Sequence, residues 1–251
     1  MLSGTGRRRV VFTHAFTSAR LALLAALCCC LAAACGGGRQ EEGTRHFEKG
    51  RELRRAGDLA GARTEFERAA ELIPDSDNAH YLLGLTLDDL GEQEAAGKAL
   101  RRALELNPTR AVTHHSYGNV LRRLGDNAGD LREQTEAVRL EPDNVPFLVA
   151  LGSAQEQAGD QAAAQTSFEH AAALDSAPRV RATAYMRLGY LLAARGEYAK
   201  ASDALRRGLE LDPTDDYARQ KLKEVDETRA AGGAGAGTGP PPAPTPPGKK
   251  F

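Results

Sequence analysis

Tryptophan is absent from this 251-residue sequence, and aromatic residues make up only 5% of it. Valine and isoleucine are also sparse, which argues against a large β-sheet. Alanine, leucine, arginine and glutamate are abundant instead, and this composition favours helices that pack through small and aliphatic side chains. The formal net charge is −1, so the chain lacks the positive excess of nucleic-acid-binding proteins, and we expect no nucleic-acid partner.

Cysteine is confined to one short stretch that holds Cys28, Cys29, Cys30 and Cys35. Cysteines this close together cannot staple a fold through disulfides. No cysteine and histidine pair with metal-site spacing follows them, so we expect no metal and no cofactor. The sequence also has no Ser-His-Asp arrangement and no phosphate-binding loop. We therefore predict no catalytic residues, no enzyme activity and no small-molecule substrate.

The N-terminal stretch has the pattern of an export signal. An uncharged apolar run from Leu21 to Cys35 follows four arginines, which are Arg7, Arg8, Arg9 and Arg20. The run has 15 residues, too few to span a bilayer, which takes roughly 20, but enough for the core of a signal peptide. Its end, Leu-Ala-Ala-Ala-Cys35 followed by glycines, resembles a bacterial lipobox. The resemblance implies a lipoprotein signal peptide over residues 1–35 and lipidation of Cys35.

Other interpretations of this end stay open. It could be an ordinary signal peptide cut after an Ala-x-Ala sequence, or an uncleaved single anchor, and the arginines before Val10 faintly resemble a twin-arginine signal. Gly36 stands where an aspartate would favour retention at the inner membrane, so we expect the outer membrane. Residues 36–43 are interpreted as a flexible tether. Residues 230–251 are interpreted as a disordered Gly/Ala/Pro-rich tail that acts as a spacer, or alternatively as a proline-rich ligand.

Glycine recurs at a fixed period along the rest of the chain. The first set is spaced by 34, 34, 34 and 37 residues: Gly50, Gly84, Gly118, Gly152 and Gly189. A second glycine comes seven residues after each, and an acidic residue follows it directly, as in Gly57-Asp58 and Gly91-Glu92. Glycine is favoured at helix C-termini and acidic residues at N-termini, so each such pair predicts the end of one helix and the start of the next. Leucine and alanine between these marks recur at helical spacing.

This 34-residue pattern resembles the tetratricopeptide repeat (TPR). Other positions of the family pattern are Ala62, Ala96, Ala164, Ala201, Pro74, Pro108, Pro142 and Pro213. The resemblance covers about residues 43–229 and implies an all-α, right-handed superhelical solenoid of helix-turn-helix repeats. It places five repeats within 44–215, at about 43–76, 77–110, 111–144, 145–180 and 181–215. Residues 216–229 are interpreted as the C-terminal capping helix that such arrays require.

Two repeats depart from this pattern. The fourth has Ser176 where proline is expected, and three extra residues follow near Ala177 to Val180. The third has Asp130 at the small position and Gln134 where leucine or phenylalanine stands elsewhere. A buried unpaired carboxylate is costly. We therefore expect the second helix of this repeat to be shifted, looser or partly exposed, unless Asp130 pairs with a nearby arginine.

Three histidines, His46, His80 and His114, recur 34 residues apart and raise the question of a metal site. Neighbouring repeats place equivalent helices about 8–10 Å apart, whereas ligands sit about 2 Å from one zinc ion. Side chains from three successive repeats cannot converge on one ion, so we interpret these residues as packing histidines. His115 is predicted to face the groove instead.

The resemblance also implies a concave groove lined by the first helix of each repeat. One row is predicted to be Phe47, Tyr81, His115, Val149 and Met186, and the next Arg51, Leu85, Asn119, Ser153 and Tyr190; the charged edge holds Arg54, Arg55, Asp88, Asp89, Arg122 and Arg123. An apolar floor of this kind suits an extended peptide or an amphipathic helix of another protein. Phe47, Leu85 and His115 stand where the clamp for C-terminal carboxylates in this family needs polar or basic residues, so we do not expect that activity.

We therefore predict a non-catalytic scaffold or adaptor for other proteins, attached by its lipid anchor to the bacterial cell envelope and facing the periplasm. Its layout resembles that of repeat lipoproteins that assist secretin or type IV pilus assembly. One alternative is a regulatory subunit that presents a peptidoglycan or glycan enzyme. A second is a cytoplasmic TPR adaptor whose N-terminus has been misread.

Overall fold

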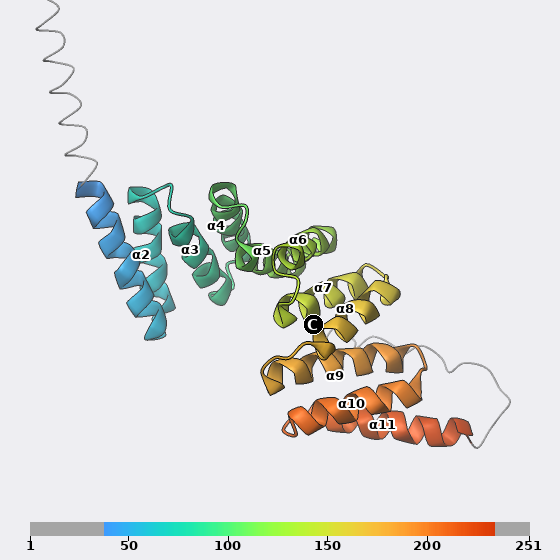
Figure 1. Cartoon of the computed structure of the whole chain (residues 1–251). Helices are drawn as coiled ribbons and strands as arrows, with labels where there is room; N and C mark the ends of the chain where they lie inside the picture. The colour runs from blue at the N-terminus through green and yellow to red at the C-terminus, as the bar shows by residue number, and fades with distance from the viewer. Residues whose placement is uncertain (1–37, 234–251) are drawn as a thin grey trace, which may run out of the picture. The chain divides into compact units, whose positions relative to one another are not determined.

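The computed structural model describes residues 38–233, and the regular structure in this range is entirely α-helical (Figure 1). This confirms the predicted all-α fold class. The expected signal peptide over residues 1–35, with Cys35, lies outside the described residues, as does most of the expected tail. The described chain divides into two compact units with the boundary between Thr109 and Arg110, and each unit is described by itself.

The first unit contains two helix pairs. A helix over residues 38–55 is followed by α2 (Leu59–Leu72), and α3 (Asp77–Asp89) is followed by α4 (Gln93–Leu106). Figure 1 shows α2, α3 and α4 side by side in chain order, and α3 packs most extensively on α4. The core between neighbouring pairs includes Ala69, Ile73 and Ala79, with Phe47 packed against them.

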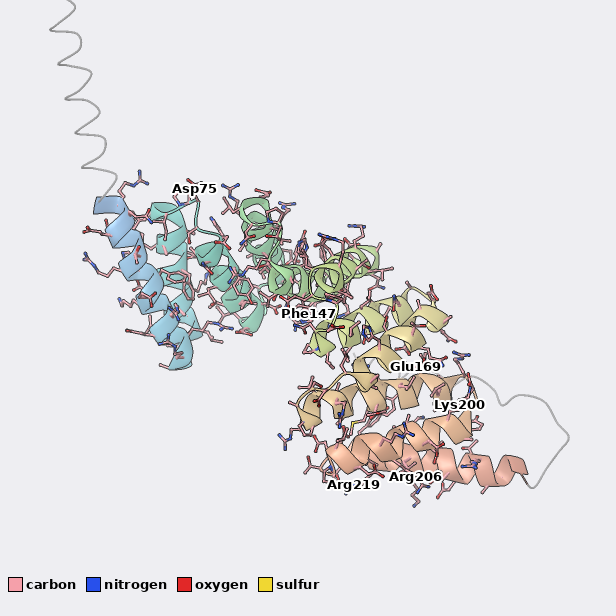
Figure 2. The ribbon with its side chains drawn as sticks, viewed as in Figure 1. Asp75, Phe147, Glu169, Lys200, Arg206 and Arg219 are labelled. Atoms are coloured by element: carbon pink, nitrogen blue, oxygen red, sulfur yellow. The ribbon has the colours of Figure 1, made fainter. Side chains whose placement is uncertain are left out.

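The second unit contains three helix pairs and a final helix. The pairs are α5 (Ala111–Arg123) with α6 (Asn127–Leu140), α7 (Val145–Gln157) with α8 (Gln161–Ala173), and α9 (Pro178–Ala194) with α10 (Tyr198–Leu211); α11 (Asp216–Gly233) follows. Helix α11 packs on α10 and also touches α9. Charged side chains of the second helices, such as Lys200 and Arg206 of α10, are exposed (Figure 2), and the Arg206 guanidinium pairs with Asp226 on α11.

The same backbone turn joins the two helices of each pair. In the second pair, Gly91 has a φ of 81°, its N–H donates to the Asp88 carbonyl, and the Glu92 N–H donates to the Leu87 carbonyl. Gly57, Gly125, Gly159 and Gly196 adopt the same left-handed conformation with equivalent bonds. This is the two-bond motif that satisfies carbonyls at a helix end, and glycine adopts it without a steric penalty. The predicted helix ends are thus confirmed.

The acidic residue after the turn caps the next helix when it is an aspartate. The carboxylate of Asp58 accepts from the Gly61 N–H at 2.8 Å, and Asp126 and Asp160 cap α6 and α8 in the same way. The two glutamates at this position make no side-chain cap bond. Glu92 pairs with Arg63 instead, and Glu197 pairs with neighbouring basic residues.

A small residue on one helix accommodates a large residue on its partner within each pair. A Cβ atom added to Gly152 would lie 2.5 Å from the ring of Phe168, and one added to Gly84 would lie 2.6 Å from Leu100. Real Cβ atoms do not approach that closely, so the absence of a side chain lets these helices pack tightly. Ala62, Ala96, Ala164 and Ala201, the small residues at the equivalent place on the second helices, are all fully buried.

Three boundaries differ from the sequence prediction. Residues 38–43, expected as part of a tether, are helical, because Gly43 lies against Ile73 and extends the contact with α2. Residues 230–233, expected in the tail, continue α11. The three extra residues near Val180 lengthen α9, which has 17 residues where α7 has 13. Among the helices described, none is long and apolar enough to cross a membrane.

Candidate partner-binding surface

The first helices of the second unit carry a set of half-buried side chains with mixed chemistry. They are His115 and Asn119 on α5, Val149 and Ser153 on α7, and Tyr190 on α9. The His115 ring packs against Phe147 with 4.9 Å between ring centroids, which connects α5 to α7. The Ser153 hydroxyl donates to the Val149 carbonyl at 2.9 Å within α7. These residues thus offer aromatic, aliphatic and small polar groups, all partly accessible to a ligand.

The first unit places the predicted residues on its own first helices. Phe47 and Arg51 on the helix over residues 38–55, and Tyr81 and Leu85 on α3, are all half-buried. The Arg51 guanidinium lies 5.8 Å from the centroid of the Phe47 ring. A hollow of about 160 Å³ lies beside them, lined by Arg51, Arg54, Arg55, Phe66 and Leu82. This surface is therefore more basic than the corresponding surface of the second unit.

Several charges of the predicted edge are paired within the chain. Arg54 Nη2 donates to Asp89 Oδ2 at 2.7 Å, which joins the two first helices of the first unit. In the second unit, Arg122 Nη2 donates to Asn119 Oδ1 at 3.1 Å. Arg55 and Arg123 are exposed. A partner that binds here meets charges that are already partly neutralised, so the edge discriminates between partners more than it adds affinity.

Met186 departs from the prediction because it is buried, with 6% of its surface exposed. The resemblance placed it in the groove, but α11 covers this part of α9, and Met186 packs with Ala182 and Ala218. Its neighbour Tyr190 stays half-exposed beside a hollow of about 370 Å³, which is lined by Thr183, Met186, Arg187, Tyr190, Asp215 and Tyr217. Tyr217, Thr183 and Arg187 were missed by the sequence prediction.

A signal in the sequence could have found Tyr217. Asp215 accepts from the Ala218 N–H just as Asn144 accepts from the Phe147 N–H at the start of α7. Helix α11 therefore starts like the first helix of a sixth repeat. Tyr217 lies 34 residues after Thr183 and so holds the same place in α11 as Thr183 holds in α9.

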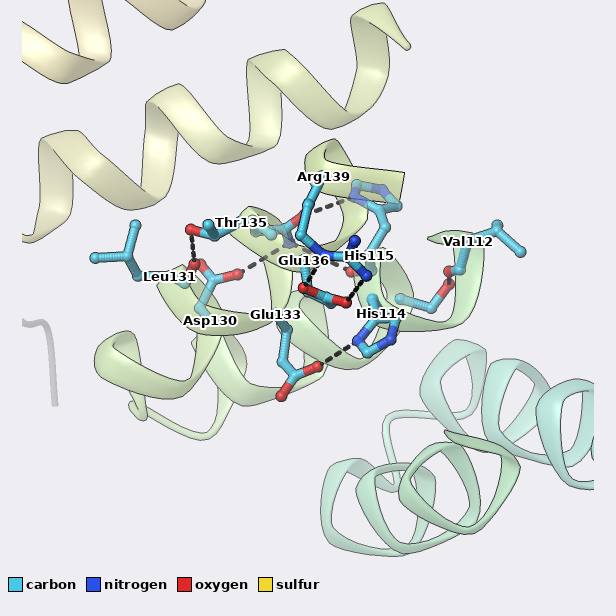
Figure 3. A network of polar contacts seen from close by, with 11 residues as sticks. Val112, His114, His115, Asp130, Leu131, Glu133, Thr135, Glu136 and Arg139 are labelled. Atoms are coloured by element: carbon cyan, nitrogen blue, oxygen red, sulfur yellow. Dashed lines mark hydrogen bonds and ion pairs between the residues drawn. The ribbon is translucent and has the colours of Figure 1, made fainter. Parts of the chain in front are cut away.

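The third helix pair contains a buried polar network (Figure 3). Asp130 and Gln134 are 1% and 0% exposed. Gln134 Nε2 donates to Asp130 Oδ1 at 2.9 Å and to the His115 carbonyl at 3.3 Å, and Arg122 Nε lies 3.7 Å from Asp130 Oδ2. The expectation that this helix would be exposed at Asp130 is thus wrong, and the alternative, pairing with a nearby arginine, is confirmed.

Burial dominates the electrostatics of this network. Removal from water raises the pKa of Asp130, against the opposite effects of the Gln134 hydrogen bond and of Arg122. Burial likewise lowers the pKa of His115, against the effects of its bond to Gln134 and of the Asp130 charge. In the neutral His115 ring, Nδ1–H donates to Gln134 Oε1 at 2.9 Å, and Nε2 accepts from Asn119 Nδ2 at 3.1 Å. Both ring nitrogens of this predicted groove residue are therefore already engaged inside the protein.

The in-phase histidines are held by local partners. His46 Nδ1 lies 2.5 Å from Glu65 and His114 Nδ1 lies 2.8 Å from Glu133, in both cases a residue of the second helix of the same pair. The second pair has no acidic residue at that place, and His80 Nε2 bonds the Pro74 carbonyl at 3.1 Å. No group of three metal-ligating side chains comes together within residues 38–233.

Comparison with solved structures shows the same fold in several proteins. A structure described as MamA is 20% identical with a TM-score of 0.62, and the match covers 69% of this chain and 93% of that one. YrrB, described as a TPR protein with an unusual peptide-binding site, is 20% identical with a TM-score of 0.60, covering 71% and 90%. Pseudomonas aeruginosa pilF is 21% identical with a TM-score of 0.64, covering 78% and 90%.

Comparison with sequence families identifies the repeat itself. No curated protein sequence matches the chain. Three family profiles described as tetratricopeptide repeat match residues 47–111, 145–178 and 182–215. The stretch between the first two of these matches is the helix pair that carries Asp130 and Gln134. The matches together span more than half of the sequence, and the chain belongs to the tetratricopeptide repeat family.

Proposed function

We propose that this protein is a non-catalytic scaffold that holds an extended segment or an amphipathic helix of another protein against the first helices of its repeats. The observation that carries the proposal is the set of half-buried side chains on α5, α7 and α9, namely His115, Asn119, Val149, Ser153 and Tyr190. Aromatic residues that are partly desolvated and surrounded by small polar groups are the usual anchors of protein interfaces.

The chemistry of this surface suits a peptide. Extended segments and amphipathic helices bind through alternating apolar anchors together with hydrogen bonds along the backbone. Val149 and the rings of His115 and Tyr190 supply apolar contact, while Asn119 and Ser153 supply polar groups. The description of the similar structure YrrB as having a peptide-binding site supports a peptide ligand for this fold.

We also propose a place for the scaffold in the bacterial cell envelope, where it would assist assembly of a secretin or type IV pilus complex. This part rests on the N-terminal sequence, in which an apolar run of 15 residues ends at Cys35. Stable attachment requires more than one acyl chain, and a diacylated cysteine would provide it. The repeats would then be presented at the membrane surface, most consistently that of the outer membrane on its periplasmic side.

Site-specific photo-crosslinking tests the scaffold proposal. A photoreactive residue is placed at Ser153 on α7 or, as a matched control, at Thr166 on α8. The two positions are alike locally, because each hydroxyl donates to the carbonyl four residues earlier, at 2.9 Å and 3.1 Å. In native envelopes, position 153 should repeatedly label one protein that position 166 does not. Equal labelling from both positions contradicts a partner site on the first helices.

A substitution then measures the contribution of this surface. Ser153→Arg places a large charged side chain on the proposed surface and should lower capture of the labelled protein at least tenfold. Thr166→Arg should leave capture unchanged, and circular dichroism checks that both variants are folded. If the captured protein is a peptidoglycan or glycan hydrolase whose activity depends on the scaffold, the regulatory-subunit alternative replaces the assembly role.

A further inference from the structure

An aromatic hollow lies at the start of α11, where this final helix covers α9. Its volume is about 370 Å³, and Tyr190, Tyr217, Met186 and Thr183 are among the residues that line it. The two rings meet edge to face, 5.3 Å apart at 77°. Tyr217 is 64% exposed, more than any other large hydrophobic side chain in the described residues.

The two tyrosine hydroxyls beside the hollow are free to donate hydrogen bonds to a ligand. Among the contacts within residues 38–233, neither the Tyr190 nor the Tyr217 hydroxyl has a hydrogen-bond partner. Burial, with the nearby charge of Asp215, raises the pKa of Tyr190 to about 12, so this hydroxyl keeps its proton at neutral pH. A suitable ligand therefore offers flat apolar groups to two rings and carbonyl oxygens to two hydroxyls.

A proline-rich segment has these properties. In the polyproline II conformation the backbone makes no internal hydrogen bonds, so its carbonyls are free to accept. Proline rings pack on aromatic side chains, and aromatic-lined grooves with phenol or indole donors are a recurrent way to bind such segments. The cost in conformational entropy is small, since proline already restricts the free chain.

The chain itself carries a segment of this kind. Residues 240–247 read Pro-Pro-Pro-Ala-Pro-Thr-Pro-Pro, and they begin seven residues after Gly233, the last residue of α11. Helix α11 has 18 residues, which at 1.5 Å per residue is about 27 Å. The 14 residues from 234 to 247 can span up to about 45 Å when extended. The proline-rich residues can thus return along α11 to the hollow at its start.

Attachment to α11 also makes this segment the favoured occupant. A ligand joined by a short linker is present at an effective concentration in the millimolar range, so a weak site is filled. Charge adds to the match, because Lys249 and Lys250 follow the prolines, and Asp215 and Asp216 lie beside Tyr217.

We propose that residues 240–247 dock within the same chain onto the hollow formed by Tyr190 and Tyr217. The proposal goes beyond the scaffold function and holds whether or not an external partner uses α5 and α7.

Photo-crosslinking of the full chain tests the proposal. With p-benzoylphenylalanine at position 217, irradiation should join position 217 to a peptide that contains residues 240–247. The same probe at Glu169, an exposed residue of α8, should give no such product. Changing the six prolines of residues 240–247 to alanine keeps the length and charge of the segment and should lower the yield at least tenfold. Failure to obtain the crosslink, or an equal yield from the alanine variant, overturns the proposal.

Isotope mixing distinguishes the source of the segment. Equal amounts of ¹⁵N-labelled and unlabelled chains are mixed before irradiation, and crosslinked peptide pairs are analysed by mass spectrometry. Pairs of a single isotope support docking within one chain. If crosslinked pairs combine labelled and unlabelled peptides as often as random pairing of chains would give, the segment docks between copies, and the proposal of docking within one chain is overturned. Partner capture through Ser153 is measured separately, so failure of either proposal is recognised without reference to the other.

Discussion

The buried polar network of the third helix pair permits a quantitative test by double substitution. Asp130→Ala with Gln134→Leu gives this pair the residues of the second pair, where Ala96 and Leu100 are buried at the same places. A Cβ atom on Gly118 would lie 2.6 Å from Gln134, as one on Gly84 would from Leu100. The facing helix thus provides the same space in both pairs, and leucine should fit opposite Gly118 without strain.

The single and double variants are expected to differ in their free energy of unfolding. Gln134→Leu alone removes the amide that donates to a carboxylate that is 1% exposed, which should destabilise by about 1–3 kcal/mol. Arg122 offsets little of this loss, because its side chain is 38% exposed and its charge is screened by solvent. Asp130→Ala alone removes the costly carboxylate and should be close to neutral. The double variant removes the carboxylate together with the amide, although the His115 Nδ1–H and the His115 carbonyl still lose Gln134 as a partner. It should therefore be more stable than Gln134→Leu alone by about 1–3 kcal/mol.

The pH dependence of the free energy of unfolding provides a second, independent test. Burial raises the pKa of Asp130 in the folded state above its ordinary value of 3.8. The folded protein therefore binds this proton more tightly than the unfolded chain, and the wild type loses stability as the pH rises from about 3.8 through the raised pKa. The double variant lacks this loss. The stability of the double variant relative to the wild type should therefore be greater at pH 7 than at pH 4.

Urea unfolding followed by circular dichroism at 222 nm measures all four proteins of the cycle. The coupling between the two sites is the difference between the double variant and the sum of the single variants. The Gln134 bond and the Asp130 charge both raise the pKa of His115, so its titration differs among the four proteins and is followed separately by NMR. An unchanged midpoint for Gln134→Leu, or a double variant less stable than both single variants, would refute the reasoning from burial.

Other predictions concern packing, ionisation, binding and attachment. Gly152→Ala places a Cβ atom 2.5 Å from the Phe168 ring and should lower stability to urea by about 1–3 kcal/mol; an unchanged midpoint would contradict the close packing. The pKa of Tyr190 is raised to about 12, so the folded state should lose stability between pH 10 and 12, and Tyr190→Phe should reduce that loss; absorbance at 295 nm follows the titration. Tyr81→Ala with Tyr190→Ala should weaken partner capture while circular dichroism stays unchanged, and full capture by the folded variant would argue against the proposed surface. Cys35→Ser should abolish labelling by palmitate and retention in membranes, and a labelled Cys35→Ser protein would refute lipidation at this residue.

The periodic part of the fold was predictable because its determinants are local. A glycine that must adopt a positive φ, such as Gly91, marks the end of a helix without reference to distant residues. An aspartate directly after it, such as Asp58, caps the next helix through a bond three residues away. The burial of Asp130 could not be predicted from local sequence in this way. The free-energy cost of burying its carboxylate depends on Arg122, which lies on the preceding helix.

The candidate site was less predictable, because it depends on what covers each first helix. The repeat pattern places Met186 at an inward position, but whether that position is open depends on how α11 packs. The pairing of Arg54 with Asp89 joins two repeats and is visible only once neighbouring repeats are placed side by side. The helix starting at residue 38 was missed because glycines near Gly43 were interpreted as linker residues, although Gly43 packs against Ile73.

The repeated turn between paired helices has a consequence for how such a protein can change over time. Its two bonds, as from Gly91 to Asp88 and from Glu92 to Leu87, use only backbone atoms. The side chains of Asp88 and its neighbours therefore do not determine whether the turn forms. Mutations at those positions can alter charge at the surface while the helix junction persists. During evolution, substitutions at these positions can therefore change which partners bind while the fold stays the same.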